Sequence, residues 1–155
     1  MAATGMTTDA LTVVVDHLTG ARRGERQRLA ADQRLRFGRH PDCEIAFDAH
    51  DDLDASSRHA ELRPTDRGWL LVDLGSSNGT FVGGQRVTEA PVARDQALDI
   101  EFGAGGPRVR LFVGTDAAAA ALPAIARAAR GRRWWWLAGG LALVAAAAVA
   151  IARLA

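Results

Sequence analysis

Three short segments of this chain carry side chains and backbone groups suited to holding an oxyanion. They are Phe37-Gly38-Arg39-His40, Ser56-Ser57-Arg58-His59-Ala60 and Gly75-Ser76-Ser77-Asn78-Gly79-Thr80. Between them they offer guanidinium groups, hydroxyls, and turns rich in Ser, Asn and Gly that expose backbone N–H groups. A phosphate favours this combination, because its oxygens accept several charge-assisted hydrogen bonds at once. The three segments therefore predict a phosphate-binding site.

Each segment taken alone is a weak signal, since a Gly-Arg pair is also typical of a solvated strand end and Ser-Ser-Asn-Gly of a hairpin turn. In this order, and followed by Thr80-Phe81-Val82 and Gly83-Gly84-Gln85-Arg86-Val87, they resemble the forkhead-associated (FHA) domain, a module that binds phosphothreonine peptides. The resemblance covers roughly residues 11–113. It implies an all-β fold, an FHA-type β-sandwich of about 11 short strands.

The resemblance also implies roles for the first two segments. Gly38 ends a strand, and Arg39 contacts the phosphate, because a planar fork of donors matches a phosphate dianion better than a point charge does. Ser56 donates its hydroxyl to the phosphate, and Arg58 lies near the phosphate or the peptide. His59 ties the binding loops together, so we expect a hydrogen-bonded structural histidine rather than a catalytic one.

In the third segment the resemblance makes Ser77 a phosphate-side hydroxyl and Asn78 the contact to the ligand backbone. An Asn amide offers both a donor and an acceptor for that purpose. Gly79 permits the positive φ of a tight turn. Ser57 remains an alternative to Ser56 as the direct hydroxyl, although the three-residue offset from the histidine favours Ser56.

The loop before Ser56 departs from a simple phosphate site because it is crowded with acidic residues. Four aspartates occur there with one histidine: Asp48, His50, Asp51, Asp52 and Asp54. Their charges should repel a phosphate, or select a ligand with basic residues beside the phosphothreonine. A metal-binding EF-hand pattern fails, since Leu53 stands where the turn glycine should be. We therefore expect no metal site and a solvated acidic loop.

An enzyme is disfavoured by the context of its one candidate nucleophile. Ser77 occupies the serine position of a G-x-S-x-G pattern, but a strand-like segment follows it in place of a helix. The chain has no Lys, which excludes Schiff-base and Ser–Lys chemistry. We expect a binding module without a cofactor, whose partner is a phosphothreonine-containing protein of a Ser/Thr-kinase pathway. The alternative is a scaffold of the same fold that binds its partner independently of phosphate.

The charge of the chain is divided between its two parts. All 18 acidic residues and 14 of the 19 basic residues, every one an Arg, lie within residues 1–116, which therefore carry −4; the remainder carries +5. A net-acidic domain binds nucleic acid poorly, because nonspecific affinity comes from neutralising many phosphates. Cys43 is the only cysteine, so no intrachain disulfide forms, and we expect a small residue at a strand edge. The Arg-only, Ala-rich composition indicates a bacterial protein.

Strand-like runs alternate with turns over most of the chain, and helical periodicity is absent until residue 117. Many short strands at such spacing indicate a β-sandwich. The runs expected to be strands are 11–15, 26–30, 34–37, 44–47, 59–63, 69–74, 80–82, 86–88, 97–102 and 108–113. Residues 1–10 are expected to form a flexible tail, and residues 114–133 an Ala- and Arg-rich linker.

The last part of the chain predicts a membrane anchor. Residues 134–152 carry no charge, and a helix over residues 134–155 would reach ~33 Å, enough to span a hydrocarbon core. Three consecutive tryptophans at its start suit a membrane interface. A buried Ala-rich helix and an interfacial helix are the alternatives. Because Arg130, Arg132 and Arg133 precede the span, we expect the FHA domain on the cytoplasmic face of a single-pass protein.

Overall fold

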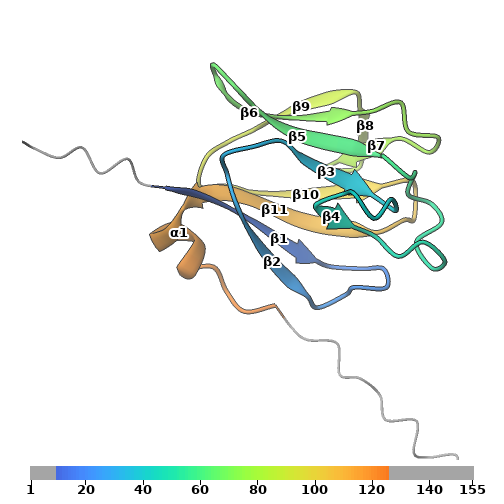
Figure 1. Ribbon diagram of the computed structural model, residues 1–155, viewed down its shortest axis with the longest axis horizontal. Helices are drawn as coiled ribbons and strands as arrows, with labels where there is room; N and C mark the ends of the chain where they lie inside the picture. Colours follow the sequence, from blue (N-terminus) through green and yellow to red (C-terminus); the bar gives the residue numbers. More distant parts are fainter. Residues whose placement is uncertain (1–9, 126–155) are drawn as a thin grey trace, which may run out of the picture.

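The computed structural model describes residues 10–125, which form two β-sheets packed face to face (Figure 1). The six-stranded sheet has the order β2-β1-β11-β10-β7-β8 and consists of β1 (Leu11–His17), β2 (Arg26–Ala30), β7 (Thr80–Val82), β8 (Gln85–Val87), β10 (Ala97–Phe102) and β11 (Arg108–Thr115). The five-stranded sheet has the order β4-β3-β5-β6-β9 and consists of β3 (Leu35–Gly38), β4 (Ile45–Ala46), β5 (Ala60–Thr65), β6 (Gly68–Asp73) and β9 (Glu89–Val92). The all-β sandwich expected from the sequence is confirmed.

Side-chain alternation along the strands builds the core between the sheets. In β1, Val13 and Val15 point into the main core, whereas Val14 between them packs on the outer face of the sheet. The core ends in an aromatic group: Phe102 stacks on Phe37 with 5.0 Å between ring centroids, and Phe47 lies 4.9 Å from Phe102. This aromatic group lies beneath the loops that carry the three motifs.

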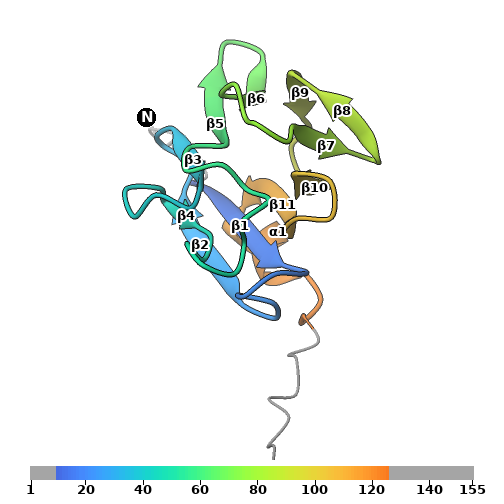
Figure 2. The ribbon, with the colours of Figure 1, turned by 90° about the vertical axis from the view of Figure 1, so that its right-hand side faces the viewer.

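Five loops gather at one end of the sandwich, the end that faces the viewer in Figure 2. They join β1 to β2, β3 to β4, β4 to β5, β6 to β7 and β10 to β11. Hydrogen bonds connect them directly: Gly103 N–H donates to the Gly79 carbonyl at 2.8 Å, and Ala21 N–H donates to Asp52 Oδ1 at 3.1 Å. The three sequence motifs therefore lie on neighbouring loops of this loop end.

Most strands begin or end one or two residues away from the expected boundaries, and two of the differences involve a proline. The run 59–63 extends as β5 to Thr65, so that Pro64 lies in a strand rather than in a turn. Residues 89–92, for which no strand was expected, form β9 at the edge of the five-stranded sheet. Pro91 interrupted the pattern, yet proline is tolerated at a sheet edge, where its missing N–H faces away from the ladder.

The range expected to be a linker begins with ordered structure. Strand β11 continues to Thr115, whose hydroxyl caps the short helix α1 (Asp116–Ala120) by accepting the Ala118 N–H at 3.2 Å. Residues 116–125, here called the return segment, then run back across the outer face of the six-stranded sheet (Figure 1).

The return segment is bound to the sheet by packing and by hydrogen bonds. Ala119 is fully buried against Val14 and Phe112. Arg28 Nη2 donates to the Ala119 carbonyl at 2.9 Å, and Arg26 Nη2 donates to the Pro123 carbonyl at 2.7 Å. These contacts make the return segment part of the folded unit.

Residues 10–125 include no helix long and apolar enough to cross a membrane. The predicted membrane-spanning helix, residues 134–155, lies outside the described residues, as do residues 126–133 of the predicted linker and residues 1–9 of the predicted tail.

Candidate phosphate-binding site

Gly38 and Arg39 lie where β3 enters the loop end. A Cβ on Gly38 would lie 2.2 Å from the carbonyl oxygen of Ser57, so only glycine permits this close approach of two backbones. The Arg39 N–H donates to the Ser56 carbonyl at 3.1 Å. The Gly-Arg pair thus joins the end of β3 to the Ser-Ser-Arg-His segment. The first two motifs must be adjacent in this way if both contribute to one phosphate site.

The guanidinium of Arg39 is held by the loop between β4 and β5. Its Nε donates to the Ala55 carbonyl at 2.6 Å and its Nη1 to the Ala49 carbonyl at 3.0 Å. Within residues 10–125 its third nitrogen, Nη2, makes no hydrogen bond, and the side chain is half-buried. The arginine is therefore fixed in orientation while part of its fork remains free to bind an anion.

Ser56 connects the second motif to the third. Its Oγ accepts the Ser77 N–H at 3.0 Å, and its own N–H donates to Nδ1 of His59 at 2.9 Å. The hydroxyl hydrogen of Ser56 is not used in these contacts, because Oγ acts in them only as an acceptor. The side chain of Ser77 is exposed beside it. Two serines whose hydroxyls can donate to an anion are therefore joined by one hydrogen bond between their loops.

His59 is fully buried beneath the site and serves as a brace between loops. Because Nδ1 accepts the Ser56 N–H, it carries no proton, and Nε2 donates to the Gly79 carbonyl at 3.0 Å. The ring lies edge-on against Phe102, with 5.2 Å between centroids. Burial lowers the pKa of His59 below its ordinary value, although the bond to Gly79 and the Asp73 carboxylate act in the opposite direction. The ring is thus neutral, which agrees with the structural role expected from the sequence.

The turn of the third motif is organised by Asp73. Its Oδ1 accepts the N–H groups of Gly75 and Ser76, at 2.8 and 2.9 Å, and its Oδ2 accepts the hydroxyls of Ser76 and Thr80, at 2.5 and 2.7 Å. Burial alone would raise the pKa of this carboxyl, but the donated hydrogen bonds outweigh it, and the pKa of Asp73 lies below its ordinary value. Ser76 also accepts the Gly79 N–H, so the turn is rigid on both sides of Ser77 and Asn78.

Asn78 and Gly79 complete the contact between the loops. Asn78 Nδ2 donates to the Asp54 carbonyl at 2.9 Å, which leaves its amide oxygen available at the exposed surface. Gly79 has φ +85°, the positive value expected for this turn. A Cβ there would also lie 2.5 Å from Nε of Arg86. The structure therefore brings Arg39, Ser56, Ser77 and Asn78 together in one connected group.

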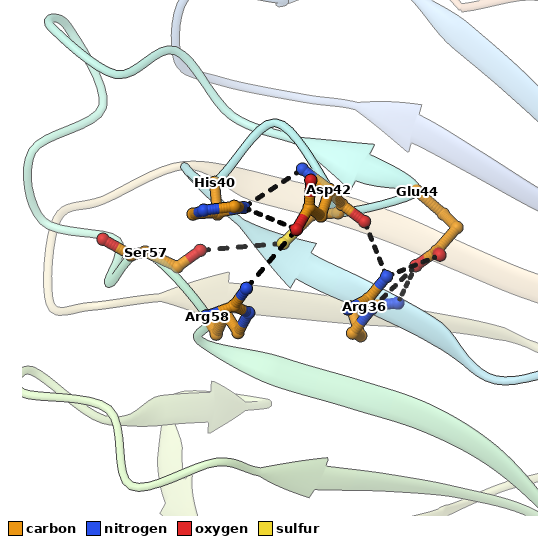
Figure 3. Close-up of polar contacts among 7 residues, drawn as sticks. Arg36, His40, Asp42, Glu44, Ser57 and Arg58 are labelled. Carbon is orange, nitrogen blue, oxygen red and sulfur yellow. Dashed lines mark hydrogen bonds and ion pairs between the residues drawn. The ribbon is translucent and has the colours of Figure 1, made fainter.

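Arg58, the remaining residue expected to contact the ligand, points instead toward the loop between β3 and β4 (Figure 3). Its Nη2 lies 3.4 Å from Oδ2 of Asp42, and Nδ1 of His40 lies 3.4 Å from the same oxygen. Both partners of the Arg58–Asp42 pair are exposed, with 51% and 58% of their side chains accessible. Beside it the Ser57 carbonyl accepts the His40 N–H at 2.9 Å, while the Ser57 side chain is exposed. The Arg58 guanidinium is therefore paired with an acidic neighbour.

The acidic loop before Ser56 is not simply solvated, which corrects the expectation from the sequence. Asp52 is buried, with 5% of its surface accessible. Its two carboxylate oxygens accept the N–H groups of Ala21 and Asp48, so it anchors the loop to the turn between β1 and β2. Asp51 and Asp54 are exposed, as expected. The Asp48 carboxylate also accepts the N–H groups of His50 and Asp51, so Asp48 and Asp52 organise the loop, while Asp51 and Asp54 give its surface a negative charge.

The sequence did not predict the structural roles of three acidic residues at the site: Asp73, Asp52 and Asp42. Asp73 did leave a local signal, because an Asp three residues before a Ser is typical of a turn in which the carboxylate accepts backbone N–H groups. The roles of Asp52 and Asp42 depend on partners 31 and 16 residues away in the chain. Local sequence carries no signal for such distant pairings.

Comparison with known proteins places this arrangement in a family. The family model of the FHA domain matches residues 35–103, from the start of β3 to just after β10. The glycogen accumulation regulator GarA of Mycobacterium tuberculosis is 41% identical over 63 residues, which are 41% of this chain and 37% of GarA. The oxoglutarate dehydrogenase inhibitor of Corynebacterium diphtheriae is 49% identical over 45 residues, 29% of each chain. The matched part thus spans well under half of the length of these curated relatives.

Solved structures show the same fold. The FHA-1 domain of Mycobacterium tuberculosis Rv1747 aligns with a TM-score of 0.55 and 21% identity, covering 68% of this chain and 98% of that one. A domain from a structural and functional analysis of phosphothreonine-dependent FHA domain interactions aligns with a TM-score of 0.51 and 27% identity, covering 67% of this chain and 96% of that one. Residues 35–103, with the strands that complete the two sheets, are therefore an FHA domain.

Proposed function

We propose that this FHA domain binds protein segments that carry phosphothreonine. The observation that carries the proposal is the hydrogen bond from the Ser77 N–H to Ser56 Oγ, which joins two loops that carry donors. Arg39, whose Nη2 makes no hydrogen bond within residues 10–125, adjoins Ser56 through its own N–H. Adjoining loops of one end of the sandwich thus carry a guanidinium and the two hydroxyls of Ser56 and Ser77. A phosphate dianion has enough oxygens to accept from all three, whereas an unmodified threonine hydroxyl does not.

Each residue has a distinct part in the proposed complex. Arg39 supplies the positive charge, and its fixed fork lowers the entropy lost on binding. Ser56 and Ser77 donate their hydroxyls to phosphate oxygens. Asn78 keeps its bond to the Asp54 carbonyl and uses its amide oxygen to accept an N–H of the ligand backbone. Gly38 and His59 hold this arrangement without touching the ligand.

The solved FHA domain of the phosphothreonine-dependent study supports this assignment, since it shares the fold at 27% identity. The curated relatives are named as a regulator and an inhibitor, which favours a binding protein over an enzyme. We infer that the domain acts in Ser/Thr-kinase signalling or in the assembly of a complex. A phosphate-independent scaffold with the same fold is the competing function.

We further propose that the domain is tethered to the cytoplasmic face of a membrane. This part rests on the sequence alone: residues 134–152 are uncharged, and the arginines before them favour the cytoplasmic side. Extraction of membranes with alkaline carbonate tests it. The full chain should stay in the membrane pellet, and its recovery in the supernatant would contradict the anchor.

The binding function is tested with two degenerate peptide libraries that differ only in the fixed central residue, phosphothreonine or threonine. The full chain, solubilised in mild detergent, should retain the phosphothreonine library and not the other. Arg39→Ala should lose this retention, whereas Arg67→Ala is the matched control, because Arg67 is an exposed arginine in the turn between β5 and β6. Equal retention of the two libraries would establish the scaffold instead.

A further inference from the structure

The described part of the chain, residues 10–125, exposes only two large apolar side chains. They are Leu53, with 63% of its surface accessible, and Leu74, with 40%. Single exposed leucines are common on protein surfaces and need no explanation. Here, however, one lies on the loop that carries Ser56 and the other on the loop that carries Ser77. This coincidence connects the two leucines to the proposed binding site.

The two loops run antiparallel past each other, and hydrogen bonds define their register. The Leu74 N–H donates to the His59 carbonyl at 2.9 Å, Ser77 contacts Ser56, and Asn78 donates to the Asp54 carbonyl. In this register Leu74 lies at the His59 end of the paired segments, and Leu53, which precedes Asp54, lies at the other end. The leucines therefore flank the Ser56–Ser77 contact on opposite sides.

The backbone next to each exposed leucine is fixed by hydrogen bonds. Beside Leu53, the buried Asp52 carboxylate is bonded to Ala21 and Asp48. After Leu74, the Asp73 carboxylate binds the N–H groups of the next two residues. The side chains are thus presented to solvent at fixed positions, and a ligand gains their burial without first ordering the loops.

We propose that Leu53 and Leu74 are specificity-determining contacts that select phosphothreonine segments with an aliphatic side chain on each side of the phosphorylated residue. The proposal rests on the proposed function of the same site. Each leucine is three residues from the serine of its own loop, at most about 10 Å of extended chain. The matching side chains of an extended ligand therefore lie within about three residues of the phosphothreonine.

The test uses a degenerate peptide library with a fixed phosphothreonine and the full chain in mild detergent. Wild type should enrich Leu, Ile, Val or Met on both sides of the phosphothreonine. Leu53→Ser should lose the enrichment on one side and Leu74→Ser on the other, while both still require phosphate. Leu70→Ser is the matched control, because Leu70 is half-buried on β6 away from the loop end.

A double-mutant cycle checks that the effect is a direct contact. For the best peptide from the library, each leucine variant should lower the affinity roughly tenfold, and Ser in place of the matching aliphatic residue of the peptide should have the same effect in wild type. The two changes combined should cost no more than either alone. Phosphate-dependent binding without aliphatic enrichment, or with enrichment unchanged in both variants, would overturn this inference and leave the proposed function intact. Equal binding of the threonine library would overturn the proposed function itself.

Discussion

The Ser56 hydroxyl oxygen accepts the backbone N–H of Ser77 at 3.0 Å, so that one side chain joins the two loops of the proposed site. This contact distinguishes Ser56 from Ser57, whose hydroxyl makes no hydrogen bond within residues 10–125. The sequence left Ser57 as an alternative to Ser56 for the hydroxyl that binds the phosphate directly. The geometry favours Ser56, because its side chain is hydrogen-bonded to the neighbouring loop.

Replacement of these serines should separate their roles. Ser56→Ala removes a donor to the phosphate and frees the Ser77 loop, so phosphopeptide affinity should fall roughly 10- to 100-fold, as for loss of a hydrogen bond to a charged group. Ser57→Ala should change the affinity less than threefold, on the order of experimental error. Isothermal titration calorimetry with one phosphothreonine peptide checks both. A larger loss for Ser57→Ala than for Ser56→Ala would reverse the assignment.

Asp42 should restrain the affinity of the site through Arg58. Asp42 Oδ2 lies 3.4 Å from Nη2 of Arg58, and both side chains are exposed, so the ion pair contributes less than about 1 kcal/mol to the stability of the fold. Asp42→Asn should therefore leave the unfolding free energy nearly unchanged but release Arg58 toward the ligand, raising phosphopeptide affinity a few-fold. Adding Arg58→Ala should abolish that gain. If Asp42→Asn weakens binding, the ion pair positions Arg58 instead of restraining it.

His59 should make stability depend on pH. Its pKa in the folded domain is lowered from 6.5 by burial, and the unfolded chain therefore binds a proton at higher pH than the folded one does. The stabilisation is fully present above pH 6.5 and is lost as the pH falls from there through the folded pKa. His17 acts in the same direction, since burial also lowers its pKa.

Two measurements check the pH prediction. Urea unfolding should give a smaller unfolding free energy at pH 5.5 than at pH 7.5. NMR titration of the histidine ring resonances should assign to His59 a midpoint below that of the unfolded chain. A midpoint for His59 at or above 6.5 would contradict the neutral, buried ring described here.

The return segment should stabilise the sandwich even though it lies outside the matched FHA range. A chain that ends at Thr115 exposes Phe112, which is 4% accessible, together with Val14. Burial of a large apolar side chain contributes about 1.5–3 kcal/mol, so the chain ending at Thr115 should be less stable by roughly that amount than one ending at Ile125. Thermal unfolding of the two chains tests this prediction. Equal midpoint temperatures would mean that residues 116–125 contact the sheet without stabilising it.

The sequence was sufficient for the elements with local signals and insufficient for those built by distant contacts. The turn glycine Gly79 and the strand that ends at Gly38 followed from short patterns. Strand β9 was missed because Pro91 resembles a turn residue unless the strand is known to lie at an edge. The burial of Asp52 could not be predicted, since its partner Ala21 belongs to another loop.

The same distinction applies within the site. Arg39, Ser56, Ser77 and Asn78 were predicted together because their three motifs occur in a fixed order. The Asp42–Arg58 pair was not, because it depends on the side-chain directions of two loops rather than on either sequence segment. Motif order therefore predicted the four donors, whereas the ion pair that holds Arg58 was seen only in the structure.

Calorimetric titration of the full chain with one peptide in two forms, phosphothreonine and threonine, tests the central claim most directly. Wild type and Arg67→Ala should bind the phosphorylated form and not the other. Arg39→Ala should lose roughly 2–5 kcal/mol of binding free energy, the typical result of removing one partner from a buried charge pair, with an unchanged circular dichroism spectrum. Binding of the phosphorylated peptide to Arg39→Ala with the affinity of wild type would contradict the proposed site.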